Sequence, residues 1–144
     1  MTDVEERFAT ALYGTARMWR QAIDRRLKYL GVSQASWMTI AVAAKARKPL
    51  SQSELADGLA VEAATMVAMV DRLVRAGLVK REPSTTDRRI KHVVVTEAGY
   101  RLFDAVKAEA AAVRKQLLSK LEPKKLETAT DVLEALQGMI DAAA

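Results

Sequence analysis

The densest group of chemically active side chains lies in one short segment, residues 81–91, which holds four basic residues and two acidic ones. Guanidinium and ammonium groups bind backbone phosphates, and an arginine at a turn tip fits a narrow minor groove of DNA. Asp87 precedes two arginines and can brace one of them while the other reaches out. A solvated basic turn is the alternative interpretation. We expect the DNA contacts of this segment to come from Arg81, Ser84, Asp87, Arg88, Arg89 and Lys91.

Other kinds of chemistry find little support in the sequence. His92 is the sole histidine and there is no cysteine, which leaves no convincing catalytic triad, thiolate metal site or thiol redox sensor. No glycine-rich phosphate loop is present either. We therefore expect no enzyme activity, no metal site and no cofactor, and we interpret His92 as a strand residue that faces solvent or DNA.

The basic segment must be held by a β-hairpin. Residues 90–96 are rich in β-branched side chains, and residues 83–87 have the composition of a turn. The pattern predicts two strands with a polar, basic tip, and it is the only strand-like region that we expect in the chain.

Two helices precede the hairpin. The segment Ser51–Glu54 has the sequence of a capping box and predicts a short helix. A longer helix is expected from near Glu62 to Gly77, with Met66, Met69, Val70 and Leu73 as its buried face. Two helices joined by so tight a turn are typical of a helix-turn-helix.

In a helix-turn-helix, the first half of the second helix meets the bases in the major groove. That half contains no Arg, Lys, Asn or Gln, so specificity would depend on DNA shape and on the hairpin. The start of the short helix can hold a phosphate, although a purely structural cap is the alternative. The predicted contacts of these helices are Ser51, Gln52, Ser53, Ala63, Ala64, Thr65, Ala68 and Arg72.

Helices with apolar faces flank this module on both sides. Phe8, Leu12 and Ile23 belong to an apolar stripe in the first helix, and similar spacing recurs after residue 100. A small module offers these faces no obvious partner, whereas antiparallel packing between two chains would bury them. The sequence thus predicts a homodimer.

The expected fold is mostly α with one β-hairpin wing in a single chain, 1–144. A winged helix-turn-helix lobe at 33–99 lies between dimerisation helices at 1–31 and 100–144. The net charge of +5 suits a polyanionic partner. The first residues lack a signal-peptide pattern, and no apolar run is long enough for a membrane helix, so we expect a cytoplasmic protein that does not use a membrane.

The wing sequence, Asp87 to Gly99, resembles the signature of the MarR/SlyA family of winged-helix transcriptional regulators. Its pattern is an aspartate, an arginine two residues on, a spaced valine, then threonine and glycine. Residues 73–79 resemble the end of that family's recognition helix. Residues 17–20, 23–27 and 33–37 resemble its SlyA branch.

This resemblance implies a homodimer whose terminal helices intertwine and whose two lobes bind a pseudo-palindromic operator in double-stranded DNA. We expect repression, with activation as the alternative, because the effect depends on where the site lies relative to a promoter. It places Arg88 and Arg89 in the minor groove. Ala64 and Ala68 depart from the SlyA branch, which typically has proline and arginine at these positions. The resemblance therefore does not predict the operator sequence.

The resemblance also implies an effector, a small aromatic carboxylate or phenol. It would bind between the dimerisation helices and the DNA-binding lobe, and its binding would lower DNA affinity. Arg17, Arg20 and Trp37 match that region. The favoured alternative is that Trp37 belongs to the core and that the arginines form ion pairs.

Two rival functions stay open at this point. The alanine-rich helix could instead contact a partner protein, although a module of that kind has no need of a basic wing. The dimer could also sequester a small aromatic molecule without regulating anything. Steep salt dependence of DNA binding would favour the regulator.

Overall fold

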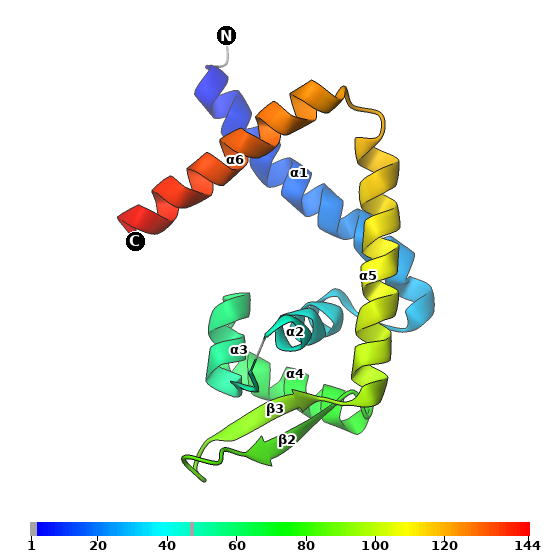
Figure 1. Cartoon of the computed structure of the whole chain (residues 1–144), viewed down its shortest axis with the longest axis vertical. Helices are drawn as coiled ribbons and strands as arrows, with labels where there is room; N and C mark the ends of the chain where they lie inside the picture. Colours follow the sequence, from blue (N-terminus) through cyan, green and yellow to red (C-terminus); the bar gives the residue numbers. More distant parts are fainter. Residues whose placement is uncertain (1–2, 47) are drawn as a thin grey trace. The chain divides into compact units, whose positions relative to one another are not determined.

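The computed structural model describes residues 3–46 and 48–144, which form two compact units, Met1–Glu109 and Ala110–Ala144 (Figure 1). The fold is mostly helical with a small antiparallel sheet, as the sequence predicts. In chain order the elements are α1 (Val4–Leu27), a 3₁₀ helix (Lys28–Leu30), α2 (Gln34–Lys45), β1 (Leu50–Ser51), α3 (Gln52–Leu59), α4 (Ala63–Arg75), β2 (Val79–Pro83), β3 (Lys91–Val95), α5 (Glu97–Leu118) and α6 (Pro123–Ala143).

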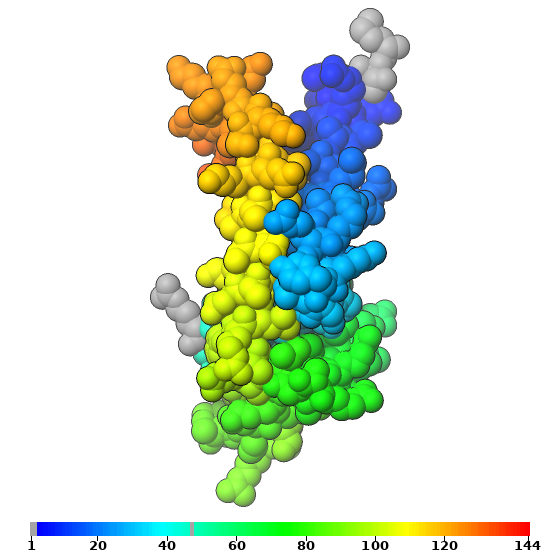
Figure 2. Space-filling model, turned by 90° about the vertical axis from the view of Figure 1, so that its right-hand side faces the viewer, coloured from blue at the N-terminus to red at the C-terminus, as the bar shows by residue number. Residues whose placement is uncertain are grey.

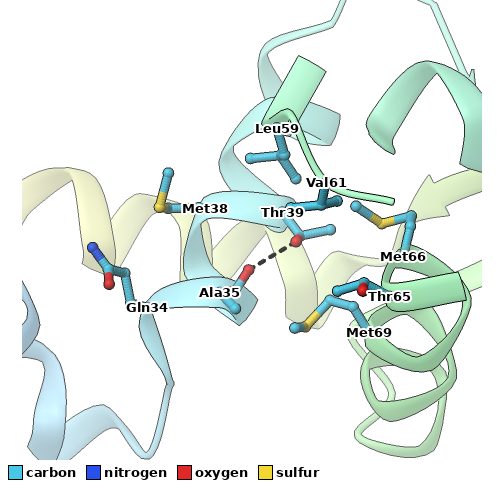
Figure 3. A pocket seen from close by; sticks show the side chains of 9 residues that line it. All are labelled: Gln34, Ala35, Met38, Thr39, Leu59, Val61, Thr65, Met66 and Met69. Atoms are coloured by element: carbon cyan, nitrogen blue, oxygen red, sulfur yellow. Dashed lines mark hydrogen bonds between the residues drawn. The ribbon is translucent and has the colours of Figure 1, made fainter. Parts of the chain in front are cut away.

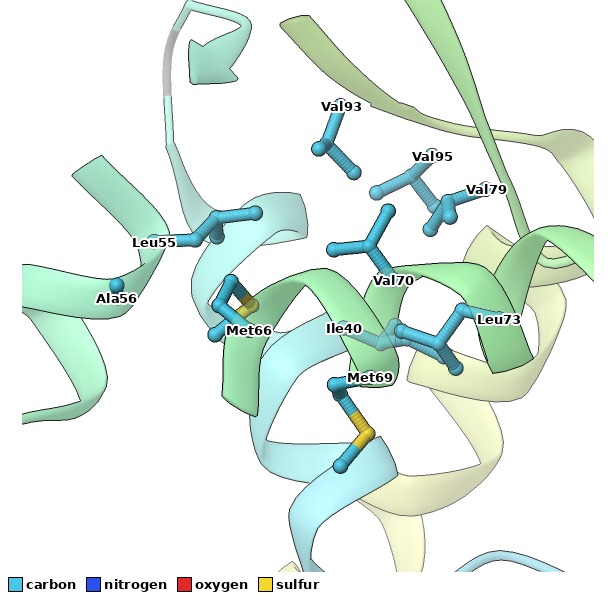
Figure 4. Close-up of a cluster of buried hydrophobic side chains, with 10 residues drawn as sticks. All are labelled: Ile40, Leu55, Ala56, Met66, Met69, Val70, Leu73, Val79, Val93 and Val95. Carbon is cyan, nitrogen blue, oxygen red and sulfur yellow. The ribbon is translucent and has the colours of Figure 1, made fainter. Parts of the chain in front are cut away.

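The core of the first unit lies between α2, α3, α4 and the sheet (Figure 4). Burial of apolar side chains from all four elements holds them together, because it removes their surface from water. The predicted face of α4 is confirmed, since all four of its residues are buried. The buried cluster comprises Ile40, Leu55, Ala56, Met66, Met69, Val70, Leu73, Val79, Val93 and Val95.

Both helices of the helix-turn-helix begin and end where their local sequence allows. The predicted capping box starts α3: Ser51 Oγ accepts from the Glu54 N–H at 3.1 Å, and the Glu54 carboxylate accepts from the Ser51 N–H at 3.0 Å. This backbone donor lowers the pKa of the Glu54 carboxyl group. Gly77 follows α4 with a φ of 77°, the left-handed conformation that glycine adopts most easily.

The sheet has three strands in the order β1-β3-β2, so the prediction that the hairpin is the only strand-like region is wrong. Leu50 pairs with Val93 and Ser51 with His92, which adds β1 to the far side of β3. A strand of two residues is too short to show the alternating pattern by which strands are recognised in a sequence. The hairpin itself is confirmed, with Val79 opposite Val95 and Pro83 opposite Lys91.

A close contact joins the end of α4 to the start of α5. The Thr96 hydroxyl donates to the Gly77 carbonyl at 2.7 Å and accepts from the Gly99 N–H at 3.1 Å. Gly99 is buried, and a Cβ there would overlap the Leu78 carbonyl oxygen and lie 2.6 Å from Cγ1 of Val95. Only glycine lets the two segments come this close.

The end of α1 is fixed to α5 by one carboxylate with two partners. Glu109 accepts from Arg26 Nε at 3.0 Å and from the Tyr29 hydroxyl, which lies just beyond α1. The Tyr29 hydroxyl and then the Arg26 guanidinium lower the pKa of Glu109, and the same hydrogen bond raises the pKa of Tyr29. Ile23 and Leu27, which are close to Arg26 and Tyr29 in the sequence, are buried.

Because the folded state lowers its pKa, Glu109 stabilises the fold above its ordinary pKa, and that contribution disappears as the pH falls through the lowered value. We therefore expect Glu109→Gln to lower the urea midpoint of unfolding at pH 7. The difference in midpoint between the variant and the parent protein should become smaller toward pH 3. Glu134→Gln, at an exposed position of α6, is the matched control and should leave the midpoint unchanged. A difference in midpoint that does not change with pH would show that the charge of Glu109 does not contribute to stability.

Both ends of the chain leave apolar side chains uncovered. In α1, Phe8 is 42% and Leu12 39% exposed, and they lie four residues apart on one face. In the second unit α6 buries none of its residues, with Met139 61% and Ile140 69% exposed. These helices have more apolar surface than their own chain covers.

Candidate nucleic-acid interface

The tip of the hairpin between β2 and β3 projects from the rest of the first unit (Figures 1 and 2). Asp87 braces Arg89 at this tip through two side-chain hydrogen bonds of 3.1 Å each, and it also accepts from the Arg89 backbone N–H at 3.0 Å. The Arg89 guanidinium lowers the pKa of Asp87, so the carboxylate stays charged. The Arg89 side chain is nevertheless 91% exposed, so its remaining N–H groups are accessible to a partner.

Arg88 is exposed beside this pair, and no hydrogen bond or ion pair of its side chain is recorded within residues 3–46 and 48–144. The predicted division of labour, in which Asp87 braces one arginine and leaves the other to reach out, agrees with this geometry. Lys91 is exposed at the start of β3 and adds a further positive charge near the tip.

Ser84 occupies a different environment from its neighbours in the hairpin. It is only 6% exposed, and its hydroxyl accepts from the backbone N–H groups of Thr86 at 3.2 Å and Asp87 at 3.3 Å. A hydroxyl that is buried and engaged in this way shapes the turn. The Ser84 hydroxyl therefore helps to position Asp87 within the turn, and the DNA contact expected of Ser84 stays a prediction.

Arg81 connects three elements at the base of the wing. Its Nη2 donates to Asp71 of α4 at 2.7 Å, and its Nε donates to the side-chain oxygen of Gln52 in α3 at 2.7 Å. Both Arg81 and Gln52 were expected to contact DNA. These polar atoms bond within the chain, and DNA contacts by the remaining N–H groups of both side chains stay a prediction. The network fixes the wing against both helices of the helix-turn-helix. Asp71 was missed by sequence reasoning because its partner lies ten residues away with no local pattern.

Breaking this network should cost more than breaking the surface pair next to it. Arg81 is partly buried, with 28% of its side chain exposed, whereas Lys80 and Glu82 form an ion pair with 58% and 49% of their side chains exposed. We expect Arg81→Ala to lower the free energy of unfolding by about 1–2 kcal/mol, and Lys80→Ala by about 0.5 kcal/mol or less. Urea denaturation of both variants tests this. Equal losses would mean that the Arg81 network is only a surface feature.

The recognition helix α4 presents small side chains at its exposed start. Ala63, Ala64, Thr65 and Ala68 are all exposed, and Arg72 is exposed two turns further along. The structure thus brings the predicted contacts of α4 to one accessible stretch. The preceding residue Ala60, which ends α3, has a φ of 54°, unusual for a residue with a side chain.

The start of α3 is the third part of the candidate DNA-binding surface, after the wing tip and the start of α4. Ser53 is exposed, Ser51 serves as the cap, and Gln52 is held by Arg81. The free N–H groups and the positive end of the helix dipole remain suited to a phosphate group.

The three residues predicted to hold an aromatic carboxylate are not among those that line an apolar cavity of the first unit. That cavity is lined by residues of α2, the α3–α4 turn and α4, and by none of Arg17, Arg20 and Trp37. Both arginines are exposed on α1. The indole Nε1 of Trp37 is buried without a hydrogen-bond partner in the described part of the chain. Their role in ligand binding stays a prediction.

Among the described residues, no three His, Asp or Glu side chains are grouped so that they could hold a metal ion. No helix within those ranges has the length and apolar character needed to cross a membrane.

Comparison with known proteins agrees with this geometry. The sequence model of the MarR family matches residues 42–91. The crystal structure of the transcriptional regulator PA3341 is 36% identical over 94% of this chain and 98% of its own, with a TM-score of 0.82. CouR from Rhodococcus jostii RHA1, solved bound to p-coumaroyl-CoA, is 24% identical over 94% of this chain and 95% of its own, with a TM-score of 0.78.

The same fold occurs in more distant proteins. Wild-type apo MarR from E. coli is 19% identical over 94% of this chain and 98% of its own, with a TM-score of 0.82. The whole-length match at 36% identity, the family model and the winged helix-turn-helix together decide the classification. This chain belongs to the MarR family of transcriptional regulators, which are DNA-binding winged-helix proteins and not enzymes.

Proposed function

We propose that this protein acts in the cytoplasm as a homodimeric, sequence-specific repressor that binds a pseudo-palindromic operator. The observation that carries the proposal is the wing tip, where Asp87 aims an almost fully exposed Arg89 beside an exposed Arg88. A protein-binding module would have no need to hold arginines in this way.

The contacts with DNA divide by groove and by element. Arg88, Arg89 and Lys91 are proposed to bind the minor groove and its phosphates, and the start of α4 is proposed to enter the major groove. The N–H groups that begin α3 would contact the backbone, as would Ser53. Arg81, Gln52 and Ser84 would support these contacts from behind.

The uncovered faces of α1 and α6 support the homodimer. A second copy of the chain supplies a matching apolar surface, because an interface with twofold symmetry brings the same patches together. We propose that residues 1–31 and 100–144 contribute this interface and that residues 33–99 form the DNA-binding lobe. Two such lobes would place their recognition helices in successive major grooves, about 34 Å apart.

The operator should be recognised largely through its shape. Ala63, Ala64 and Ala68 cannot make bidentate hydrogen bonds with base edges, although their methyl groups can contact thymine methyls. Direct recognition by α4 is therefore weaker than in relatives of the SlyA type, and sites with a narrow, A·T-rich minor groove under each wing should be preferred.

An effector belongs to the same proposal. We propose that a small aromatic molecule lowers DNA affinity by changing the geometry of the lobes, and the solved complex of CouR with p-coumaroyl-CoA gives support from a protein of the same fold.

The deciding experiment captures fragmented genomic DNA with the purified protein at two salt concentrations and sequences what is recovered. We expect one palindromic motif, competed poorly by random DNA, with affinity falling steeply as salt rises. Sedimentation of the free protein should give a dimer, and deleting the motif upstream of a reporter should raise its transcription. No binding at low salt would reject the proposal in favour of a protein-interaction module, and binding without a motif would leave a non-specific DNA-coating protein.

A further inference from the structure

Val67 is an apolar side chain on the exposed side of the recognition helix α4, with 41% of its surface accessible. Ala64, Val67 and Ala68 have the spacing that places residues on one face of a helix, and Asp71 continues this face one turn further along. The two alanines are also exposed. The largest apolar group of this face therefore lies at its centre.

The buried side of α4 fixes the direction of this face. Met66 and Met69 extend from α4 toward α2 in Figure 3, and Val70 and Leu73 complete the buried side in Figure 4. These four residues have the same spacing as the exposed face but are shifted by two positions, which is about 200° around a helix. Val67 thus faces away from the core of its lobe.

Polar groups border the face of Val67 at its end and at one side. Oδ1 of Asp71 accepts from Nη2 of Arg81 at 2.7 Å, which offsets the negative charge at the end of the face. Arg72 is exposed on the neighbouring side of the helix, where a cation can hold a phosphate. The surface left to meet base edges around Val67 consists of methyl groups.

We infer that Val67 is a specificity-determining residue that recognises the 5-methyl group of a pyrimidine in the major groove, so that methylation of a cytosine at this contact strengthens DNA binding. The inference rests on the proposed function, because it requires the start of α4 to enter the major groove. It goes beyond that function by making the regulator sensitive to a chemical modification of its operator.

The chemistry of base edges explains why a methyl group is selected. The 5-methyl group of thymine is the apolar group that ordinary bases present in the major groove, and 5-methylcytosine carries the same group at the same ring position. Polar edge groups placed against Val67 would lose their water and gain no partner. A methyl group placed there is removed from water together with Val67, which is worth about fourfold in affinity.

The side chain of Val67 is held ready for this contact. Valine in a helix occupies one strongly preferred rotamer, so its two methyl groups have a fixed direction before DNA binds. Little side-chain freedom is lost in the complex. Val74 is the matched control, since it is 37% exposed on the same helix but lies two turns beyond the half that meets bases.

Uracil in place of thymine tests the contact, because uracil lacks only the 5-methyl group. Each thymine of the captured operator is replaced in turn, and fluorescence anisotropy measures the affinity. We expect a loss of about fourfold at one or two positions of each half-site, both in the parent protein and in Val74→Ala. Val67→Ala should bind the thymine operator about fourfold more weakly than the parent and should not distinguish uracil from thymine at those positions.

The matched control in DNA is a thymine under the wing. Uracil there should leave the affinity unchanged, because the methyl group projects into the major groove and the wing is proposed to bind the minor groove. A loss at wing positions that equals the loss under α4 would show that the effect comes from DNA shape, and it would overturn the inference.

Methylated cytosine separates recognition of the methyl group from recognition of thymine as a base. At a position where uracil weakens binding, the T·A pair is replaced with C·G, with and without a 5-methyl group on the cytosine. We expect the parent protein to bind the methylated duplex about fourfold more tightly, and Val67→Ala to bind both equally. Equal binding of the two duplexes by the parent protein would overturn the inference, as would equal affinity for uracil and thymine at every position.

Failure of this inference differs from failure of the proposed function. Specific operator binding that ignores every 5-methyl group rejects the inference alone, whereas no DNA binding at low salt rejects both. If DNA binds without a motif, random duplexes made with cytosine or with 5-methylcytosine replace the operator, and equal affinity for the two pools overturns the inference. Val67→Ala should keep the circular dichroism of the parent protein, because Val67 is exposed.

Discussion

Replacing Arg89 with alanine is expected to weaken operator binding by about ten- to hundredfold, which corresponds to roughly 1–3 kcal/mol for a well-placed groove contact. The reason is positional. Asp87 holds the guanidinium by two 3.1 Å hydrogen bonds at the tip of a hairpin, so the charge reaches DNA with little loss of side-chain freedom. Fluorescence anisotropy with the captured operator measures the change.

Arg88→Ala and Asp87→Asn test the separate contributions of Arg88 and Asp87 to DNA binding at the wing tip. Arg88 should also matter, whereas Asp87→Asn should weaken binding less than Arg89→Ala because it removes the brace and leaves the charge. Arg101→Ala is the matched control, since Arg101 is an exposed arginine on α5 that pairs with Glu97 at 3.1 Å. All variants should sediment as the parent does. Unchanged affinity in both wing-arginine variants would remove the wing from the mechanism.

Gly99→Ala is expected to be the most destabilising small substitution in the first unit, with a loss of about 3 kcal/mol or more. The new methyl group would meet the Leu78 carbonyl oxygen, which belongs to the backbone and cannot rotate away, and Cγ1 of Val95 at 2.6 Å. The start of α5 would have to separate from the connection between α4 and the wing. Urea denaturation followed by circular dichroism measures the loss.

Gly14→Ala is the natural control for this substitution. Gly14 lies inside α1, and apart from its chain neighbours and the backbone of its own helix no atom lies within 4 Å of its added Cβ. The change should therefore stabilise the protein by about 0.5–1 kcal/mol through helix propensity. A Gly99→Ala protein as stable as the parent would show that the contact between α5 and Leu78 is loose in solution.

Local patterns predicted most of the architecture because they act over a few residues. Capping at Ser51, the end of α4 before Gly77 and the buried face of α4 each depend on neighbours within a turn or two of helix. The two-residue strand β1 gave no such pattern. It exists because β3 offers it an edge, and that depends on the folded lobe.

The sequence predicted where the candidate site lies better than it predicted the role of each side chain in the site. Exposed, basic positions at 88, 89 and 91 followed from the composition of the wing. The sequence did not show that Arg81 is committed to Asp71 and Gln52, because those partners are ten and 29 residues away. Nor did it show the cavity beside α4, because three separate segments of the chain line it.

The pairing of β1 with β3 has a mechanical consequence. Ser51 is both a strand residue opposite His92 and the cap of α3, so the wing and the start of α3 meet at one residue. The hydrogen bond from Arg81 to Gln52 joins the same two elements. If both groups of residues bind DNA as proposed, the junction fixes the distance between them, and they would bind the DNA backbone together. The recognition helix α4 is held differently, by four buried side chains in the core of the lobe and by a turn that contains Ala60 with its φ of 54°.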